Sequence, residues 1–246
     1  MKREKEGKQI TIVCCWTNET QLNEFVDSVK KQTVSCELIL IDNRDSIFNS
    51  CSKAFNSVID RITTKFVIYS HQDIILFKED SLEKFIAYLK MINENDILGV
   101  AGALPEVTGT ITNVRLSENG SYAGSKRANG LNRCQTLDEC FFGGYTAKFK
   151  DDYSDEKICD NWHLYAVEMC LRTLSKGSTV YVCDIELVHL SKGRVNSIYN
   201  KTFFKLCKKY SAFLSNIATP CGYVTRTRFP YREIKLVKSN LRLYLK

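Results

Sequence analysis

Proline and histidine are scarce in this sequence, and long apolar runs are absent. Only 3 of its 246 residues are proline and 3 are histidine, and no repeat or low-complexity tract occurs, so we expect no large disordered region. No stretch reaches the roughly 20 apolar residues that a membrane-spanning helix needs. Residues 1–9 are charged and the apolar run after them is short, which does not fit a signal peptide.

Several ligand-binding patterns are also missing. No two cysteines have the C-x-x-C spacing, so a structural zinc site is not expected although the chain has 11 cysteines. An odd number of cysteines in largely apolar surroundings fits a reducing, cytoplasmic environment. Neither G-x-G-x-x-G nor G-x-x-x-x-G-K-S/T occurs, which argues against a Rossmann dinucleotide site and a P-loop.

The net charge of +7 is unevenly distributed. From Lys192 onward the chain has 13 Lys/Arg and one acidic residue, Glu233, which gives that segment +12. The preceding residues have the other 22 basic and 27 acidic side chains, or −5. We therefore expect a mildly acidic main domain, residues 1–193, followed by a strongly basic C-terminal extension, residues 194–246.

The first 77 residues have the pattern of alternating strands and helices. Apolar runs at 10–16, 38–41 and 66–69 are typical of buried strands, and apolar residues recur at helical spacing in 22–29 and 51–62. Such a β-α-β-α-β order folds into a parallel sheet because crossover connections are right-handed. The sequence therefore predicts an α/β protein with a mainly parallel central sheet.

Each of the three strands ends in polar residues. These residues are Thr17, Asn18 and Glu19 after the first strand, Asp42 and Asn43 after the second, and His71 and Asp73 after the third. Because the carboxyl ends of parallel strands meet at one edge of a sheet, where open α/β sheets bind ligands, we expect these side chains to form a nucleotide-sized site. Taken singly, each cluster also fits ordinary loop or cap chemistry.

The remainder of the chain continues the alternation. The sequence predicts a helix over 82–89 capped by Asp80 or Ser81, a strand over 97–103, a polar excursion over 108–133, a helix over 164–174 and a strand over 180–183. Two adjacent carboxylates, Asp138 and Glu139, return to the core with the apolar residues around them.

The order of short motifs resembles that of the family 2-like glycosyltransferases, and more narrowly the subgroup typified by a streptomycin-biosynthesis glycosyltransferase. The likeness runs from about Ile10 to Gly193. The motifs are Asp42-Asn43, Ala54-Phe55-Asn56, His71-Gln72-Asp73 at the position of a D-x-D triplet, Leu137-Asp138-Glu139, Trp162-His163-Leu164-Tyr165 with Glu168-Met169-Cys170-Leu171, and His189-Leu190-Ser191.

The resemblance implies an A-type glycosyltransferase fold and an inverting, divalent-metal-dependent transfer of a sugar from a UDP-, dTDP- or GDP-linked donor. It makes Asp73 the first expected ligand of Mn²⁺ or Mg²⁺ and His189 the second, although His189 equally fits an ordinary loop histidine. It places His71 and Asn56 beside the nucleotide, together with the residues after the first two strands.

One departure from the family concerns the catalytic base. An acidic pair at the start of the late helix supplies the base in many relatives, and it falls here on Tyr165-Ala166. Another group must then accept the proton of the attacking hydroxyl. The candidates are Asp138, Glu139, Asp160, His163 and Glu168, among which we favour Asp138 or Asp160 and then His163. Asp160 also fits a helix cap, Glu168 a solvated helix residue, and Trp162 either a core aromatic or a platform for a sugar.

We therefore expect an enzyme of glycan, glycolipid or glycoside assembly with a carbohydrate or lipid-linked acceptor. A nucleotidyltransferase and a non-catalytic nucleotide-sugar or glycan-binding module are the alternatives, and no nucleic-acid partner is expected. For the basic extension two interpretations stay open. It forms helices that pack on the sheet with their charges in water, or it binds an anionic membrane surface at the cytoplasmic face.

Overall fold

The computed structural model describes residues 7–107, 109–117, 120–191, 193 and 195–244. Its strands are β1 Ile10–Trp16, β2 Glu37–Asp42, β3 Phe66–Ser70, β4 Ile74–Leu76, β5 Ile97–Gly99, β6 Ala101–Ala103, β7 Ile111–Thr112, β8 Arg115–Leu116, β9 Asn132–Cys134, β10 Thr136–Leu137, β11 Phe141–Tyr145, β12 Val180–Val182, β13 Leu187–His189, β14 Asn216–Ala218 and β15 Val224–Arg226. Its helices are α1 Glu19–Lys30, α2 Cys51–Asn56, the 3-10 helix η1 Ile59–Arg61, α3 Ser81–Leu89, α4 Thr146–Asp151, α5 Tyr165–Ser175, α6 Ser197–Tyr210 and α7 Tyr231–Tyr244.

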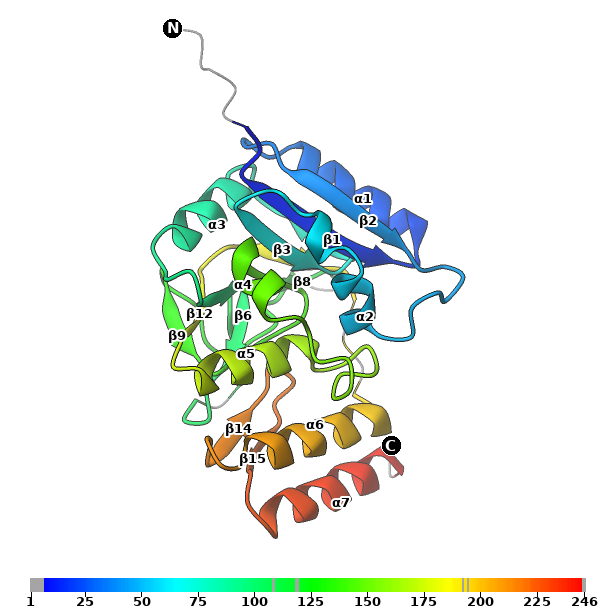
Figure 1. The fold of residues 1–246 in the computed structure, drawn as a ribbon, viewed down its shortest axis with the longest axis vertical. Helices are drawn as coiled ribbons and strands as arrows, with labels where there is room; N and C mark the ends of the chain where they lie inside the picture. Colours follow the sequence, from blue (N-terminus) through cyan, green and yellow to red (C-terminus); the bar gives the residue numbers. More distant parts are fainter. Residues whose placement is uncertain (1–6, 108, 118–119, 192, 194, 245–246) are drawn as a thin grey trace, which may run out of the picture.

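A mainly parallel seven-stranded sheet organises the molecule (Figure 1). Its strand order is β2-β1-β3-β11-β5-β12-β9, and β1 is parallel to both β2 and β3. β11 and β9 run antiparallel to their neighbours. All five residues of β3 are buried, as expected for a central strand that has helices on both faces. The predicted β-α-β-α-β order and the α/β class are confirmed.

Helices cover both faces of the sheet. On one face, α1 and α3 bury Phe25 and Phe85 in a cluster with Ile12 of β1. On the other face, α2, α4 and α5 enclose a second cluster that contains Phe55 and Tyr69, whose rings stack at 4.3 Å. These two apolar layers fix β1, β2 and β3 in register, and therefore place the loops that follow these strands side by side.

Three expected elements differ in detail. The strand expected over 97–103 is two strands, because β5 stays in the large sheet while β6 pairs with β10 and β7. The helix expected over 51–62 ends at Asn56, where the Ser57 hydroxyl donates to the carbonyl of Ala54 and competes with helix continuation. Asp80 stands at the N-cap of α3 without a capping hydrogen bond, and its carboxylate pairs instead with Lys84 at 2.7 Å.

The C-terminal segment packs on α5 rather than on the large sheet. A third apolar cluster joins Val167 and Leu171 of α5 to Phe203 and Leu206 of α6, and α7 packs on α6 (Figure 1). The expected helices are present, with the β14–β15 hairpin between them. Lys192 and Arg194, which flank the expected boundary at 193, lie outside the described residues, and the division into two domains stays a prediction.

Glu168 anchors this packing. Its side chain is fully buried, and its carboxylate accepts hydrogen bonds from Lys209 Nζ and Tyr210 Oη, each at 2.8 Å, and pairs with Arg172 Nη2 at 3.2 Å. A buried carboxylate is tolerated only when it is paired in this way. Glu168 is therefore a structural link between α5 and α6, and neither a solvated helix residue nor a group open to substrate.

We expect Glu168→Gln to lower the free energy of unfolding by about 3 kcal/mol, because the largely buried Arg172 guanidinium then keeps only Asp152 as an acidic partner, and Lys209 and Tyr210 lose a charged acceptor. Urea denaturation measures this difference. Glu24→Gln on the exposed face of α1 is the matched control and should change stability by less than about 0.5 kcal/mol. Equal stability of the two variants would contradict the structural role of Glu168.

None of the helices in the described ranges is long and apolar enough to cross a membrane.

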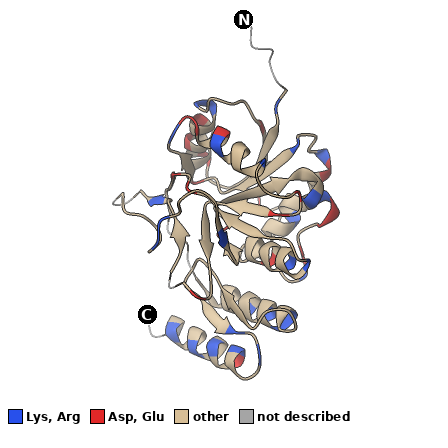
Figure 2. Cartoon of the chain, turned by 90° about the vertical axis from the view of Figure 1, so that its left-hand side faces the viewer, with Lys and Arg blue, Asp and Glu red and all other residues tan. Residues whose placement is uncertain are grey.

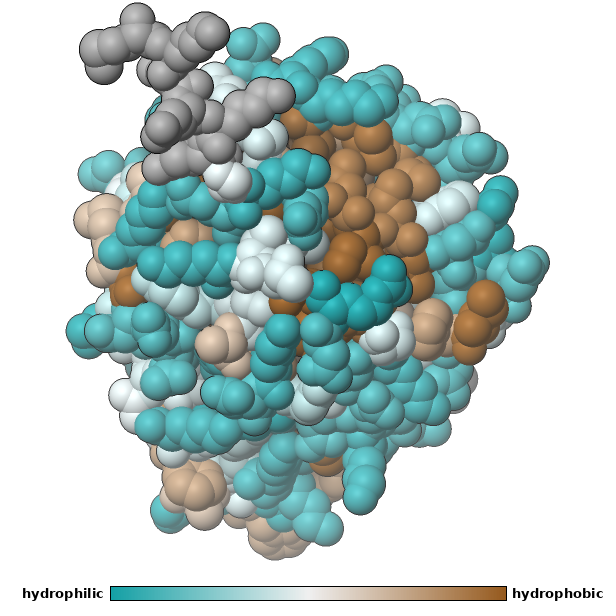
Figure 3. Space-filling view, turned by 45° about the horizontal axis from the view of Figure 1, so that its top comes forward, coloured by the Kyte–Doolittle hydropathy of each residue, from teal (hydrophilic) through white to brown (hydrophobic). Residues whose placement is uncertain are grey.

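A space-filling view of the end of the molecule that carries α1 and β2 shows an apolar area bordered by hydrophilic residues (Figure 3). At the other end, Lys and Arg gather on α6 and α7 (Figure 2). The basic residues that are concentrated in the C-terminal part of the sequence therefore also lie together at one end of the molecule.

Candidate functional site

The loops that follow β1, β2 and β3 surround a cavity of about 760 Å³, here called the first cavity. Its lining residues are Cys15, Thr17, Asn43, Arg44, Ser46, Phe48, Asn49, His71, Gln72, Asp73 and Trp162. Thr17, Asn43, His71 and Asp73 thus come together, as the strand-end argument predicted. The volume lies within the range of about 300–1,000 Å³ that is typical of small-molecule sites.

Gln72 holds two of these loops together. Its Oε1 accepts hydrogen bonds from the backbone N–H groups of Thr17 at 2.7 Å and Asn18 at 2.9 Å. Asn18 is not among the lining residues, because its side chain caps α1 by accepting from the N–H of Gln21. The sequence identified the triplet that contains Gln72 but gave no sign of this bridge.

Arg44 is the one Lys or Arg among the described residues that line the first cavity. Its guanidinium lies over the ring of Trp16, 4.5 Å from the ring centroid, and bonds Asp42 with Nη2–Oδ2 at 2.6 Å. Glu19 is 3.8 Å from the same guanidinium. Asp42 and Glu19 do not line the cavity themselves, and they contact it through Arg44. Arg44 was not among the residues expected from the sequence, although it directly follows Asp42-Asn43.

Asn43 shapes the loop that carries Arg44. Its side chain makes two hydrogen bonds to the backbone of Phe48, accepting from N–H at 2.7 Å and donating to the carbonyl at 3.1 Å. Within this loop Ser46 has a φ of 55°, a left-handed conformation that a serine rarely adopts without such support. Asn43 therefore positions the cavity wall.

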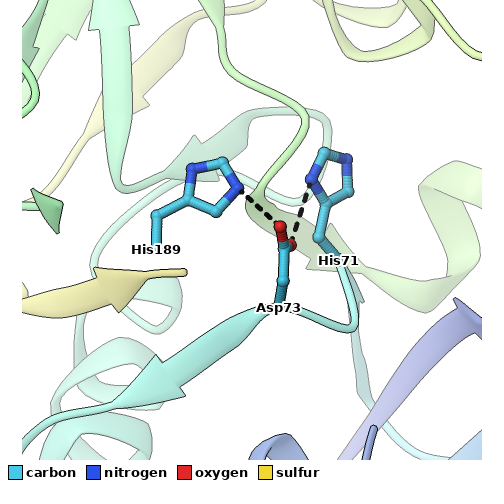
Figure 4. Close-up of side chains that lie close together, drawn as sticks. All are labelled: His71, Asp73 and His189. Atoms are coloured by element: carbon cyan, nitrogen blue, oxygen red, sulfur yellow. Dashed lines mark ion pairs between the residues drawn. The ribbon is translucent and has the colours of Figure 1, made fainter. Parts of the chain in front are cut away.

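His71, Asp73 and His189 form a compact cluster (Figure 4), of which His71 and Asp73 line the first cavity. One ligand atom from each residue lies within 4.8 Å of the others. Asp73 Oδ2 is 3.3 Å from His189 Nε2, and Asp73 Oδ1 is 3.9 Å from His71 Nδ1. Ser191 Oγ also donates a hydrogen bond to Asp73 Oδ2. The loop after β3 and the end of β13 thus meet here, since β13 pairs with β4 in register His189↔Ile74.

The electrostatics of the cluster favour a charged carboxylate between two imidazoles. Burial raises the pKa of Asp73, but the hydrogen bond and charge of His189 outweigh it, and the net pKa is well below the usual value. Burial lowers the pKa of His71. Burial also lowers the pKa of His189, yet its hydrogen bond to Asp73 reverses the effect and leaves that pKa raised.

The cluster fits a divalent cation. Two imidazole nitrogens and one carboxylate oxygen are established ligands of divalent transition metals, and nitrogen ligands suit Mn²⁺ better than Mg²⁺. His71 Nε2 is held by Tyr165 Oη at 3.0 Å, which turns Nδ1 toward Asp73. A ligand histidine is commonly fixed through its second nitrogen in this way. Tyr165 therefore orients a member of the cluster.

A second cavity of about 500 Å³ adjoins the first and shares His71 and Trp162 with it. Its lining residues are His71, Ala101, Thr110, Val114, Leu116, Ala123, Asp138, Glu139, Cys140, Trp162, His163, His189, Ser191, Gly193, Val195, Tyr199, Pro220 and Cys221. Trp162 is 41% exposed, so the expectation of a core aromatic is wrong. The cluster thus lies between two adjoining cavities.

Asp138 and Glu139 enter the second cavity from the turn between β10 and β11. Asp138 Oδ1 accepts a hydrogen bond from the N–H of Cys140 at 3.0 Å. After burial and Asp73, its charge has a smaller effect on both histidines: it opposes the lowering of the His71 pKa and helps to raise the pKa of His189. Glu139 Oε1 accepts from the N–H of Leu164. Burial, and then the neighbouring Asp138 carboxylate, raise the pKa of Glu139 to about 8.

The raised pKa of Glu139 predicts a stability difference that depends on pH. A folded-state pKa of about 8 lies above the unfolded value near 4.3. The wild type therefore loses stability as pH rises from about 4.3 to 8, because ionisation is costlier in the folded state. Glu139→Gln lacks this loss and should become more stable than the wild type by at least about 1 kcal/mol at pH 8. Thermal melts at pH 5 and pH 8 measure the difference, and equal curves at both pH values would contradict it.

Of the remaining candidates, one lines the second cavity and the others lie outside both cavities. Asp160 is outside both lining sets, and its exposed carboxylate bonds Lys205 at 3.1 Å; it is not the cap of α5, since the N-cap is Leu164. The amide of Asn56 donates to the carbonyl of Ser154 at 3.0 Å, away from the first cavity. Ala166 is fully buried in the core, which leaves no room there for a carboxylate. His163 does line the second cavity.

Several solved structures resemble this fold. S. aureus TarS 1-349 in complex with UDP-GlcNAc has a TM-score of 0.55 at 13% identity and is matched over 82% of this chain and 66% of that chain. GalNAc-T7 with UDP, GalNAc and Mn²⁺ has a TM-score of 0.54 at 12% identity over 82% of this chain and 48% of that chain. The mannosyltransferase PcManGT from Pyrobaculum calidifontis in complex with GDP-Man and Mn²⁺ has a TM-score of 0.56 at 11% identity over 87% of this chain and 66% of that chain.

This chain therefore spans less than two thirds of the length of each of these structures. At such low identity the likeness concerns the fold, which is the A-type glycosyltransferase fold. No curated protein matches the sequence. The model of a family described as glycosyltransferase-like matches residues 11–217. Because that match covers most of the sequence, the chain belongs to the glycosyltransferase-like family.

Proposed function

We propose that this protein transfers a sugar from a nucleotide-sugar donor to a hydroxyl group, with inversion at the anomeric carbon and with a divalent metal. The observation that carries the proposal is the position of the His71–Asp73–His189 cluster between two cavities that share His71 and Trp162. A donor in the first cavity and an acceptor in the second would meet beside the cluster.

The first cavity suits the nucleotide and its diphosphate. Thr17 and Asn43 lie on its wall, and Arg44 supplies a guanidinium that can bond phosphate oxygens. Two of the similar structures hold UDP or UDP-GlcNAc and one holds GDP-Man. We therefore propose a UDP-, GDP- or dTDP-linked sugar as the donor, with Asp42 and Glu19 acting through Arg44.

His71, Asp73 and His189 would hold the metal. A bound Mn²⁺ or Mg²⁺ would neutralise the negative charge that develops on the leaving diphosphate. Two of the similar structures contain Mn²⁺, and two imidazole ligands make Mn²⁺ the better match here. Tyr165 and Ser191 keep the cluster residues oriented.

Asp138 is the proposed catalytic base. It lines the second cavity and lies close enough to the cluster to perturb both histidines. From there it can accept the proton of an acceptor hydroxyl as that oxygen attacks the anomeric carbon from the face opposite the leaving diphosphate. A single displacement of this kind inverts the anomeric configuration. His163 lines the same cavity and is the next candidate, whereas Asp160 does not line it and pairs with Lys205.

The second cavity suits a carbohydrate acceptor. The exposed Trp162 offers an aromatic face, and Val114, Leu116 and Val195 give part of the wall an apolar character. The resemblance to the streptomycin-biosynthesis subgroup supports an acceptor in a glycan, glycolipid or glycoside, including one attached to a lipid.

Incubation with a panel of UDP-, GDP- and dTDP-linked sugars, with and without Mn²⁺, tests the proposal. We expect release of the nucleoside diphosphate from at least one donor, only with metal, and release should accelerate with a suitable sugar acceptor. NMR of the product should show an inverted anomeric centre. Donor binding without turnover would favour a binding module, and a lack of both would contradict the proposal.

A further inference from the structure

Helix α7 packs on α6 through a side that includes Ser239, Asn240 and the half-buried Leu236, and it turns three aliphatic residues to water. Asn240 Oδ1 accepts a hydrogen bond from Asn200 Nδ2 of α6 at 2.7 Å, and Ser239 is only 6% exposed. Ile234, Val237 and Leu241 are 46%, 58% and 55% exposed. A surface helix of a globular protein normally has the opposite arrangement. The exposed side of α7 therefore lacks a partner among the described residues.

The three aliphatic residues form one continuous stripe. They follow each other at intervals of three and four residues, which places them on one face of a helix. Phe229, 74% exposed, and Tyr231, 46% exposed, extend the apolar surface to the start of α7. We call these five residues the α7 stripe.

Positive charge borders the α7 stripe. Lys238 and Arg242 are exposed on α7, and Arg226 and Arg228 are exposed just before it. None of these four has an acidic partner in the described part of the chain. Glu233 is the one acidic residue of this segment, and it pairs with Arg232 at 2.7 Å. The charged residues around the stripe are thus mainly basic (Figure 2).

We propose that the α7 stripe docks on an anionic lipid surface. Aliphatic and aromatic side chains enter the boundary between headgroups and acyl chains, while neighbouring Lys and Arg bind anionic headgroups. A symmetric contact with a second copy of the chain would bring the same cations together, and like charges at close range oppose it. The charge around the stripe therefore favours lipid over self-association.

The second cavity shares the C-terminal segment with the α7 stripe. Val195, Tyr199, Pro220 and Cys221 of that cavity come from the segment that begins before α6 and leads to α7. The docking does not depend on the proposed sugar transfer. Its consequence, access to a lipid-linked acceptor, does rest on that function.

Vesicle co-sedimentation of the full chain tests the docking. The probes are phosphatidylcholine vesicles with and without phosphatidylglycerol, at low and high ionic strength. We expect the wild type to bind the anionic vesicles, with an affinity that falls as the salt concentration rises.

Val237→Asp and Leu241→Asp should each reduce binding at least about tenfold, because a charge replaces an inserted apolar group. Lys238→Glu/Arg242→Glu should reduce it by a similar factor, since each Lys or Arg near an anionic surface contributes appreciably. Met91→Asp, which changes an apolar residue 71% exposed and distant in sequence, is the matched control and should bind as the wild type does.

Three outcomes would overturn the docking. In the first, the wild-type protein does not bind anionic vesicles. In the second, the stripe variants bind as well as the wild type. In the third, light scattering shows a dimer that Val237→Asp dissociates, and the protein binds no vesicles. Donor hydrolysis measured without vesicles separates the two proposals. The stripe variants should hydrolyse donor as the wild type does, and vesicle binding by a protein that hydrolyses no donor would leave the docking intact and remove the sugar transfer.

Discussion

Asp73→Asn should abolish metal-dependent binding of nucleoside diphosphates. Asp73 is the central member of the cluster, 3.3 Å from His189 and 3.9 Å from His71, and it is the only carboxylate among the three residues. An amide keeps the size of the side chain but removes the negative charge that a divalent cation requires. We expect the affinity for UDP or GDP in Mn²⁺ to fall by at least about a hundredfold, because even the loss of a group that only orients a metal ligand commonly costs about 10–100-fold in metal affinity.

Calorimetry with and without Mn²⁺ measures this effect. The residual affinity of Asp73→Asn should equal that of the wild type in chelator, because only the metal-dependent part is removed. A circular dichroism spectrum and a thermal melt establish that the variant is folded. His189→Gln provides a second variant of the cluster, expected to weaken metal-dependent binding to a smaller extent. Wild-type affinity of Asp73→Asn in Mn²⁺ would show that the metal and diphosphate bind elsewhere.

Asp138→Asn should remove sugar transfer and leave donor binding unchanged. Asp138 lies in the second cavity beside the cluster, and an amide cannot accept the proton of the attacking hydroxyl. Loss of a general base typically reduces the rate by about 10²–10⁴-fold. We expect a fall of that size in kcat, with little change in the affinity for the nucleotide-sugar.

Glu139→Gln is a matched control for this experiment. It makes the same chemical change at the next residue, but burial and Asp138 raise the pKa of Glu139 to about 8, so this carboxyl is mostly protonated at pH 7. A neutral amide that still accepts the hydrogen bond from Leu164 should preserve activity at pH 7. If Glu139→Gln loses transfer and Asp138→Asn keeps it, the base is Glu139. If both variants retain wild-type rates, His163 is the next residue to replace.

The strand-end clusters were predictable because the signal is local. An apolar run that stops at His71-Gln72-Asp73 indicates where a buried strand ends, and parallel pairing then brings Thr17 and Asn43 to the same edge. The cluster partner His189 came from the family resemblance rather than from periodicity. Its position depends on the pairing of β13 with β4, which no local pattern specifies.

Other features depend on contacts that the sequence does not reveal. Arg44 was missed because its place is fixed by Trp16 and Asp42 across two loops. Asp160 was favoured as a base or cap, but α5 begins only at Tyr165, which leaves Asp160 beside Lys205 on the surface. The orientation of α7 was equally hidden, since helical periodicity shows that two faces differ and not which one is buried.

The most direct test of the proposed metal and donor site is a crystal of the protein grown with Mn²⁺ and UDP or GDP, with anomalous scattering recorded at the manganese edge. We expect one strong anomalous peak ligated by His71, Asp73 and His189, with the diphosphate beside it and the nucleoside in the first cavity against Arg44. A manganese peak elsewhere, or a nucleotide bound outside the first cavity, would contradict it.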